Sequence, residues 1–175
     1  KDSWHSEYTE LKSLLTEEEY AAARSSTLTA FYTPPEVIDA MYTALRKMGV
    51  GAGTILEPSM GVGAFFGQSH SYLYEPTTRL FGVELDSLTG RIARQLYQKA
   101  NIQITGFEKA DLPDSFFDVV IGNVPFGDYS VVDPQYNRLH FKIHDYFFAK
   151  SIDKLRTGGI IAFITTSGTL DKKSE

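Results

Sequence analysis

The stretch FDVVIGNVPFG, residues 117–127, decides the fold. Its first half contains three consecutive β-branched residues, Val119 to Ile121, a run typical of a strand that is covered on both faces. Its second half places an asparagine, a proline and an aromatic residue directly after that strand. Ligands bind at the carboxyl ends of the strands in open α/β sheets, so we expect residues 123–126 to lie at such a rim.

The residues after this strand can hold an amino group. The side-chain oxygen of Asn123 accepts hydrogen bonds. The carbonyl of Val124 is a second acceptor, because Pro125 biases the preceding residue to an extended conformation. Phe126 offers a flat face on which a base can stack, worth about 1–3 kcal/mol. The alternative interpretation is that Asn123 caps a turn and Phe126 fills the core.

Other short apolar segments predict further strands that alternate with helices. These segments are residues 54–57, 80–86, 102–104 and 160–164. Strands that alternate with helices indicate a parallel sheet with right-handed crossovers. We therefore expect an α/β fold with this sheet at its centre.

Acidic residues and glycines follow the first three predicted strands. Glu57 precedes the turn Gly61-x-Gly63, where a ligand can approach the backbone. Glu84 lies where nucleotide-binding α/β folds hold ribose hydroxyls. For a cofactor adenine we expect Glu108 first, and Asp111 as the alternative. The turn lacks the third glycine of dinucleotide-binding folds, so S-adenosylmethionine fits better than a pyrophosphate.

Local signals predict where several helices begin and end. A capping box at Thr16 and Glu19 starts one helix, which Ser25 to Thr27 should break. Thr33 is expected to cap the next helix, with proline as its first residue, and Ser87 to cap a later one. Residues 68–78 predict a surface loop. Residues 127–139 are either a lid over the substrate or a plain mobile loop.

Composition and charge restrict the possible classes of protein. The chain has 175 residues, no cysteine and a formal net charge of −5. It is expected to form a helical arm (1–29) and one domain (30–175), as a piece of a longer protein. No apolar run could span a membrane, and the lack of cysteine fits a cytoplasmic protein. His140 and His144 have the spacing of metal ligands but lack a third, so no metal site is expected.

Taken together, the motifs resemble those of the amino-group DNA methyltransferases that make N6-methyladenine. The resemblance covers about residues 30–170 and rests on Phe31-x-Thr33-Pro34, Glu57-Pro58-x-x-Gly61-x-Gly63, Glu84, Glu108 or Asp111, and Asn123-Val124-Pro125-Phe126. Their order is similar to that in type I restriction-modification methylases and in methylase domains of large helicase-containing proteins of mobile elements. It implies a Rossmann-like class I methyltransferase fold, with a mostly parallel sheet and helices on both faces.

The resemblance also implies roles for individual residues. Catalysis would use Asn123, Val124, Pro125 and Phe126. S-adenosylmethionine would contact Tyr32, Thr33, Glu57, Pro58, Ser59, Gly61, Gly63, Glu84, Leu85, Glu108, Asp111 and Asn123. The implied partners are DNA and other domains of a longer polypeptide, for target recognition and helicase action, without a membrane or a metal.

The resemblance is incomplete in two respects. Val124 stands where these enzymes usually have a first proline, which reduces rigidity but keeps the backbone carbonyl. A second aromatic wall and a target-recognition region are expected beyond the end of this chain. We therefore expect residues 1–175 to bind the cofactor better than they methylate. The rival functions are methylation of a protein glutamine or of an rRNA guanine amino group, and a non-catalytic module.

Overall fold

A computed structural model describes residues 4–29, 32–72 and 77–169 of the chain. The helices are α1 (His5–Leu14), α2 (Glu17–Thr29), α3 (Pro35–Lys47), α4 (Ala64–Tyr72), α5 (Ser87–Leu96) and α6 (Ile143–Lys154). The strands are β1 (Thr54–Glu57), β2 (Arg79–Glu84), β3 (Asn101–Ile104), β4 (Phe117–Asn123) and β5 (Leu155–Ile164). Three short 3-10 helices complete the described elements: η2 (Phe107–Lys109), η3 (Asn137–Leu139) and η4 (Ser167–Thr169).

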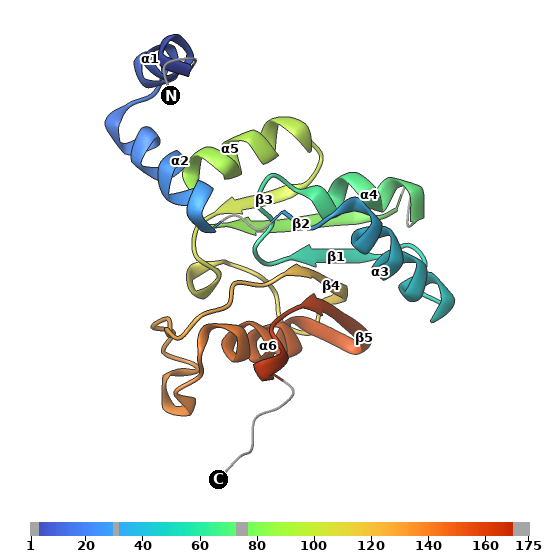
Figure 1. Cartoon of the computed structure of the whole chain (residues 1–175). Coiled ribbons are helices and arrows are strands. Elements are labelled where there is room, and N and C mark those ends of the chain that lie inside the picture. Colours follow the sequence, from blue (N-terminus) through green and yellow to red (C-terminus); the bar gives the residue numbers. More distant parts are fainter. Residues whose placement is uncertain (1–3, 30–31, 73–76, 170–175) are drawn as a thin grey trace.

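The five strands form one parallel sheet in the order β3-β2-β1-β4-β5 (Figure 1). The order reverses between β1 and β4, so the connections that follow these two strands run in opposite directions and leave a crevice outside their carboxyl ends. This confirms the expected α/β fold with a parallel sheet. The strand predicted at residues 160–164 is longer than expected, since β5 begins at Leu155. No helix in the described ranges is both long and apolar enough to cross a bilayer.

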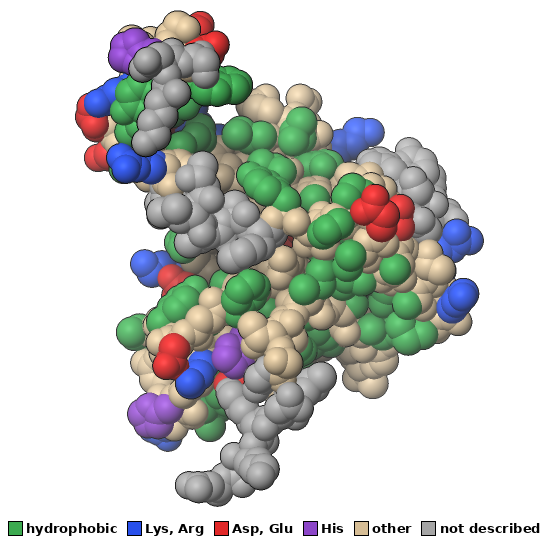
Figure 2. Space-filling view, viewed as in Figure 1, with side chains coloured by type: hydrophobic (Ala, Val, Ile, Leu, Met, Phe, Trp, Pro, Cys, Tyr) green, Lys and Arg blue, Asp and Glu red, His purple; other side chains and the backbone are tan. Residues whose placement is uncertain are grey.

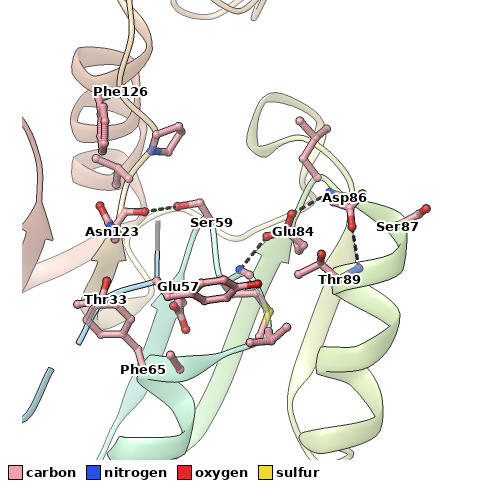
Figure 3. A pocket seen from close by; sticks show the side chains of 18 of the residues that line it. Thr33, Glu57, Ser59, Phe65, Glu84, Asp86, Ser87, Thr89, Asn123 and Phe126 are labelled. Atoms are coloured by element: carbon pink, nitrogen blue, oxygen red, sulfur yellow. Dashed lines mark hydrogen bonds between the residues drawn. The ribbon is translucent and has the colours of Figure 1, made fainter. Parts of the chain in front are cut away.

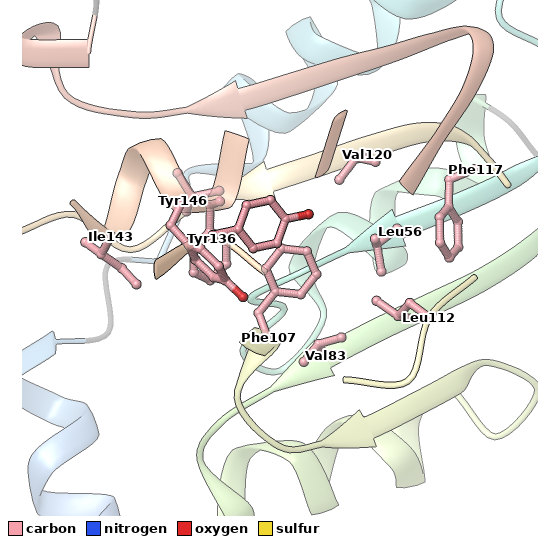
Figure 4. Close-up of a cluster of buried hydrophobic side chains, with 11 residues drawn as sticks. Leu56, Val83, Phe107, Leu112, Phe117, Val120, Tyr136, Ile143 and Tyr146 are labelled. Atoms are coloured by element: carbon pink, nitrogen blue, oxygen red, sulfur yellow. The ribbon is translucent and has the colours of Figure 1, made fainter. Parts of the chain in front are cut away.

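Helices pack on both faces of the sheet, against apolar side chains that alternate along the strands. Ile55 and Val119 pack with α3 in one core cluster. Leu56 and Val120 point to the other face, where a cluster includes Phe107 and residues of α6 (Figure 4). Neighbouring side chains of a strand point to opposite faces of the sheet, so both must be apolar when both faces are covered. The β-branched run Val119 to Ile121 in β4 predicts this arrangement.

The starts of the helices agree with the predictions only in part. The capping box before α2 is confirmed: Thr16 N–H donates to the Glu19 carboxylate at 3.0 Å, and Glu19 N–H donates to Thr16 Oγ1 at 3.2 Å. The N-cap of α3 is Pro34, so the prediction of Thr33 was wrong by one residue. The prediction of Ser87 was wrong too, because the Asp86 carboxylate caps α5 by accepting from Thr89 N–H at 2.7 Å.

Two helices continue past their predicted ends. α2 runs through Ser25 to Thr27 and ends at Thr29, because serine costs a helix interior only a few tenths of a kcal/mol. α4 extends to Tyr72, into residues 68–78 that were predicted as loop. Ser69 is buried there and donates to Phe66 O at 2.7 Å, so burial and this bond outweigh the polar composition of the segment. Residues 73–76 lie outside the described residues.

The segment after β4 is docked onto the domain. Its two ends are joined by an ion pair between Asp128 and Lys142 at 2.7 Å and by a hydrogen bond from Ile143 N–H to Tyr129 O at 2.8 Å. Its middle is joined to α6 through Asp133. The segment therefore packs on α6 as an Ω-shaped loop, and we call residues 128–142 the Ω-loop. Its action as a lid stays a prediction.

Candidate active site

The predicted site residues meet in a cavity of about 680 Å³ at the carboxyl ends of β1, β2 and β4 (Figure 3). This volume lies in the range of small-molecule sites. Eleven of the predicted residues line it: Tyr32, Thr33, Glu57, Ser59, Gly61, Glu84, Leu85, Asn123, Val124, Pro125 and Phe126. The cavity thus joins the glycine turn, the acid at the end of β2 and the Asn-Val-Pro-Phe motif in one space.

Glu84 is hydrogen-bonded to the backbone of the glycine turn and to the backbone of the residue that caps α5. Its carboxylate accepts from Gly61 N–H at 2.7 Å and from Asp86 N–H at 2.8 Å. Burial raises the pKa of Glu84, and these two backbone donors oppose the rise. Each carboxylate oxygen keeps acceptor capacity that is not used by these bonds, so the group can also receive hydroxyl donors from the cavity.

The two glycines of the turn have different roles. Gly61 has φ +55°, and a Cβ there would meet nothing within 4 Å, so this face of the turn is open. Gly63 has φ +86°, and a Cβ there would collide with the ring of Tyr97. The hydroxyl of Tyr97 also donates to Gly63 O at 2.7 Å. Gly61 therefore faces the cavity, whereas Gly63 is needed for packing against Tyr97, which follows α5, and does not line the cavity.

Glu57 is a buried acid at the base of the cavity. Its side chain is 2% exposed, and within the described part of the chain Oε2 has no hydrogen-bond partner. Burial, and then the nearby charge of Glu84, raise its pKa well above the ordinary value. The buried Oε2 atom therefore keeps its capacity to accept a hydrogen bond from a donor that enters the cavity.

The raised pKa of Glu57 predicts how stability depends on pH. The folded state holds its proton to a higher pH than the unfolded state, so the contribution of Glu57 is complete below about pH 4.5 and is lost as pH rises toward the folded pKa. Glu57→Gln should remove this loss, and its stability relative to the wild type should increase by at least about 1 kcal/mol between pH 5 and pH 8. Urea unfolding at pH 5 and pH 8 measures this difference in the free energy of unfolding, and the variant Glu18→Gln, at an exposed position, is the control. If the free energy of unfolding changes with pH equally in the wild type and in Glu57→Gln, the prediction is wrong.

The Asn-Val-Pro-Phe motif presents its polar and aromatic groups at the opposite wall. Asn123 ends β4, and its backbone carbonyl accepts from Ser59 Oγ at 3.0 Å. Val124 is 1% exposed and packs in the core. Phe126 is 38% exposed and lines the cavity, so the alternative in which it fills the core is wrong.

Four predicted cofactor residues do not line the cavity: Pro58, Gly63, Glu108 and Asp111. Asp111 is exposed, and its backbone is held by the side chain of Gln103 at 2.9 and 2.6 Å. The carboxylate of Glu108 lies close to Gly106, and its backbone carbonyl accepts from Lys150. Contact of either acid with a cofactor adenine stays a prediction.

Some residues of the cavity were not predicted. Tyr129 of the Ω-loop lines it, together with Met60, Val62, Ala64, Phe65, Asp86, Ser87 and Thr89. Because Tyr129 follows Phe126 closely in the sequence, its position could have indicated that it lines the same cavity. In the ranges that the structure describes, no group of three His, Asp or Glu residues could hold a metal ion; His144 is buried, whereas His140 is exposed.

Comparisons with solved structures define the class of fold. A type I restriction-modification methyltransferase subunit from Streptococcus thermophilus matches with a TM-score of 0.66 at 21% identity, over 82% of this chain and 36% of that chain. A SAM-dependent O-methyltransferase from Thermotoga maritima matches with a TM-score of 0.57 at 14% identity, over 79% of this chain and 47% of that chain. The fold is the Rossmann-like fold of S-adenosylmethionine-dependent methyltransferases.

The family follows from the sequence comparison. The chain belongs to the N-6 DNA methylase family, whose model matches residues 14–175. Over 139 residues it is also 30% identical to "Defense against restriction protein B" of Escherichia phage P1. The match spans 77% of this chain but only 6% of the phage protein. The family resemblance inferred from the motifs is thereby confirmed.

Proposed function

We propose that this chain transfers a methyl group from S-adenosylmethionine to the N6 amino group of adenine in DNA, as part of a longer cytoplasmic protein. One observation carries the proposal: the same cavity contains the acids and glycine turn suited to the cofactor, and the acceptors suited to an amine. A binding module for the cofactor alone would not need Asn123 and Phe126 at its wall. Family membership supports adenine as the target base.

The residues on the cofactor side would act by binding and orientation. Glu84 would accept from ribose hydroxyls while it fixes the turn through Gly61 N–H. Glu57 would face the ammonium group, and Thr33 would lie close to the methionine carboxylate. When bound, the cofactor supplies an electrophilic methyl group on its sulfonium sulfur.

The residues on the substrate side would make the amine reactive. An aryl amine is a poor nucleophile because its lone pair is delocalised into the ring. Acceptance of its two hydrogens by the Asn123 side-chain oxygen and the Val124 carbonyl would favour a pyramidal nitrogen with a localised lone pair. Phe126 would stack on the base, which must be flipped out of a duplex to reach the cavity. Positioning and electrostatics would therefore supply most of the catalysis.

Contact with DNA phosphates would depend on other parts of a longer polypeptide. The net charge is −5, and the described Lys and Arg side chains are scattered over the face shown in Figure 2 rather than gathered. Non-specific DNA affinity comes mainly from such cations. This supports the expectation that the chain binds cofactor better than it methylates, with target-recognition and helicase domains as proposed partners.

Methyl transfer from radiolabelled S-adenosylmethionine tests the function. The chain is incubated at high concentration with adenine-containing duplex and single-stranded DNA, and the DNA is digested to nucleosides for chromatography. We expect label in N6-methyladenine, and Asn123→Ala should reduce it by about 100- to 1,000-fold with cofactor affinity within about threefold of wild type. The control is Asn101→Ala, an exposed asparagine at the start of β3.

Other outcomes would favour the rival functions. Label in rRNA or in a glutamine-containing peptide, with none in DNA, would replace adenine by those substrates. Cofactor binding without transfer to any of them, even at high DNA concentration, would contradict catalysis by this chain. Failure of the folded wild type to bind cofactor would leave a non-catalytic module.

A further inference from the structure

The peptide group that joins Asn123 to Val124 is held from two sides. Its carbonyl oxygen accepts from Ser59 Oγ at 3.0 Å. Its N–H group donates to Ile164 O at 3.3 Å. The first bond comes from the turn after β1, and the second from the last residue of β5. The peptide group that immediately precedes the Val124 carbonyl is thus tied to the strands on both sides of β4.

This peptide group controls the direction of both proposed acceptors. The Asn123 side chain starts at one end of it, and the Val124 carbonyl follows at the other. Pro125 biases Val124 to an extended conformation, but no ring fixes the φ angle of Val124 itself. That angle depends on the buried Val124 side chain, which is 1% exposed, and on how the peptide group is held.

Of the two bonds, the one from Ser59 is the shorter. Its 3.0 Å lies at the upper end of the usual range for an O–H···O bond, whereas the 3.3 Å from Val124 N–H to Ile164 O lies beyond the usual range for an N–H···O bond. Ser59 itself belongs to a turn that is fixed to β2, because Met60 N–H donates to Val83 O at 2.9 Å. Ser59 therefore joins the turn after β1 to the end of β4 through the hydrogen bond that Figure 3 draws as a dashed line.

We propose that Ser59 is a positioning residue: its hydroxyl fixes the Asn123–Val124 peptide group and so aims the two acceptors of the amine. The resemblance of the motifs implies that Ser59 contacts the cofactor, whereas the hydrogen bond to Asn123 O joins its hydroxyl to the Asn-Val-Pro-Phe motif. The inference rests on the proposed function for its catalytic consequence, but the fixing of the peptide group is independent of it. Small displacements of reacting groups can lower a rate about 100-fold.

The test compares Ser59→Ala with Ser69→Ala. Ser69 also donates to a backbone carbonyl, that of Phe66 at 2.7 Å, but it lies in α4 away from the cavity. Amide hydrogen exchange, followed by NMR on the 175-residue chain, reports the Val124 N–H directly. Ser59→Ala should speed exchange at Val124 about tenfold, equal to about 1.4 kcal/mol, while Ile121 in the same strand is unchanged. Ser69→Ala and Ser59→Thr, which keeps the hydroxyl, should leave Val124 as in the wild type.

Two further measurements separate positioning from cofactor binding. Calorimetric titration of Ser59→Ala with S-adenosylmethionine should give a Kd within about twofold of wild type, and single-turnover methyl transfer should fall by at least tenfold. Unchanged exchange at Val124 would overturn the proposal, as would exchange that accelerates equally at Ile121. A tenfold weaker Kd with unchanged exchange would make Ser59 a cofactor ligand instead. If the wild type transfers no methyl group, the proposed function fails, while the exchange result still decides the role of Ser59.

Discussion

Replacement of Glu84 by alanine is expected to weaken binding of S-adenosylmethionine at least 100-fold, which corresponds to about 2.7 kcal/mol. The variant loses the acceptor for ribose hydroxyls. It also leaves the N–H groups of Gly61 and Asp86 without the partners they have at 2.7 and 2.8 Å. An unsatisfied buried donor costs about 1–3 kcal/mol, so the glycine turn should lose its fixed shape as well.

Calorimetric titration at pH 7.5 measures this effect, with circular dichroism and urea unfolding to show that the variant is folded. Glu18→Ala, at an exposed position on α2, is the control and should bind the cofactor as the wild type does. Glu84→Gln keeps one acceptor oxygen and should lie between wild type and Glu84→Ala. A Kd for Glu84→Ala within threefold of wild type would contradict the cofactor site.

The second large effect is expected on stability, at the buried ion pair of the Ω-loop. Asp133 is 6% exposed and accepts from Lys150 Nζ at 3.0 Å and from Tyr146 Oη at 2.7 Å. Burial raises the pKa of Asp133, but the bonds from Tyr146 and Lys150 outweigh burial and hold the pKa below its ordinary value. Its stabilisation is therefore present at neutral pH and is lost as pH falls through the lowered pKa.

Asp133→Ala should lower the free energy of unfolding by about 3–5 kcal/mol, because it leaves the charge of Lys150 buried and unpaired. Asp128→Ala breaks a pair of similar length, to Lys142 at 2.7 Å, but the Asp128 side chain is 86% exposed. Solvent screening limits that pair to about 0–1 kcal/mol. Urea unfolding of the two variants at pH 7 therefore compares a buried with an exposed ion pair in the same loop.

A double variant checks the cause. Asp133→Ala/Lys150→Met removes the unpaired charge and should recover part of the stability lost in Asp133→Ala. If the double variant is less stable than the single one, the loss does not come from an uncompensated charge. If Asp133→Ala costs less than 1 kcal/mol, the pair does not stabilise the docked loop.

Much of the fold and of the cavity could be predicted from the sequence, since both depend on local patterns. The β-branched run before Asn123 marks a doubly covered strand, and parallel strands bring Glu57, Glu84 and Asn123 to one rim. The resemblance added the expected target, the amino group of adenine in DNA. Helix ends were less predictable, because neighbouring residues compete: Asp86 caps α5 one residue before the expected Ser87.

The remaining features depend on contacts between distant segments. The bond from Ser59 to Asn123 spans 64 positions, and the docking of Asp133 on Lys150 spans 17. A local sequence pattern does not show which residues so far apart in the chain come into contact. For the same reason Glu108 was preferred from its place after β3, although the structure leaves both it and Asp111 out of the cavity.

The strand order has a consequence for synthesis of the protein on the ribosome. β1 pairs with β4 as well as with β2, and Thr54 N–H donates to the Asp118 carboxylate 64 residues later at 2.6 Å. Until β4 has left the exit tunnel, the nascent chain presents one edge of β1 without a neighbour. Unpaired edges invite association with other chains, and closure over so many residues is slow. A message cut short between the codons for residues 84 and 117 should therefore yield a product that aggregates or depends on a chaperone.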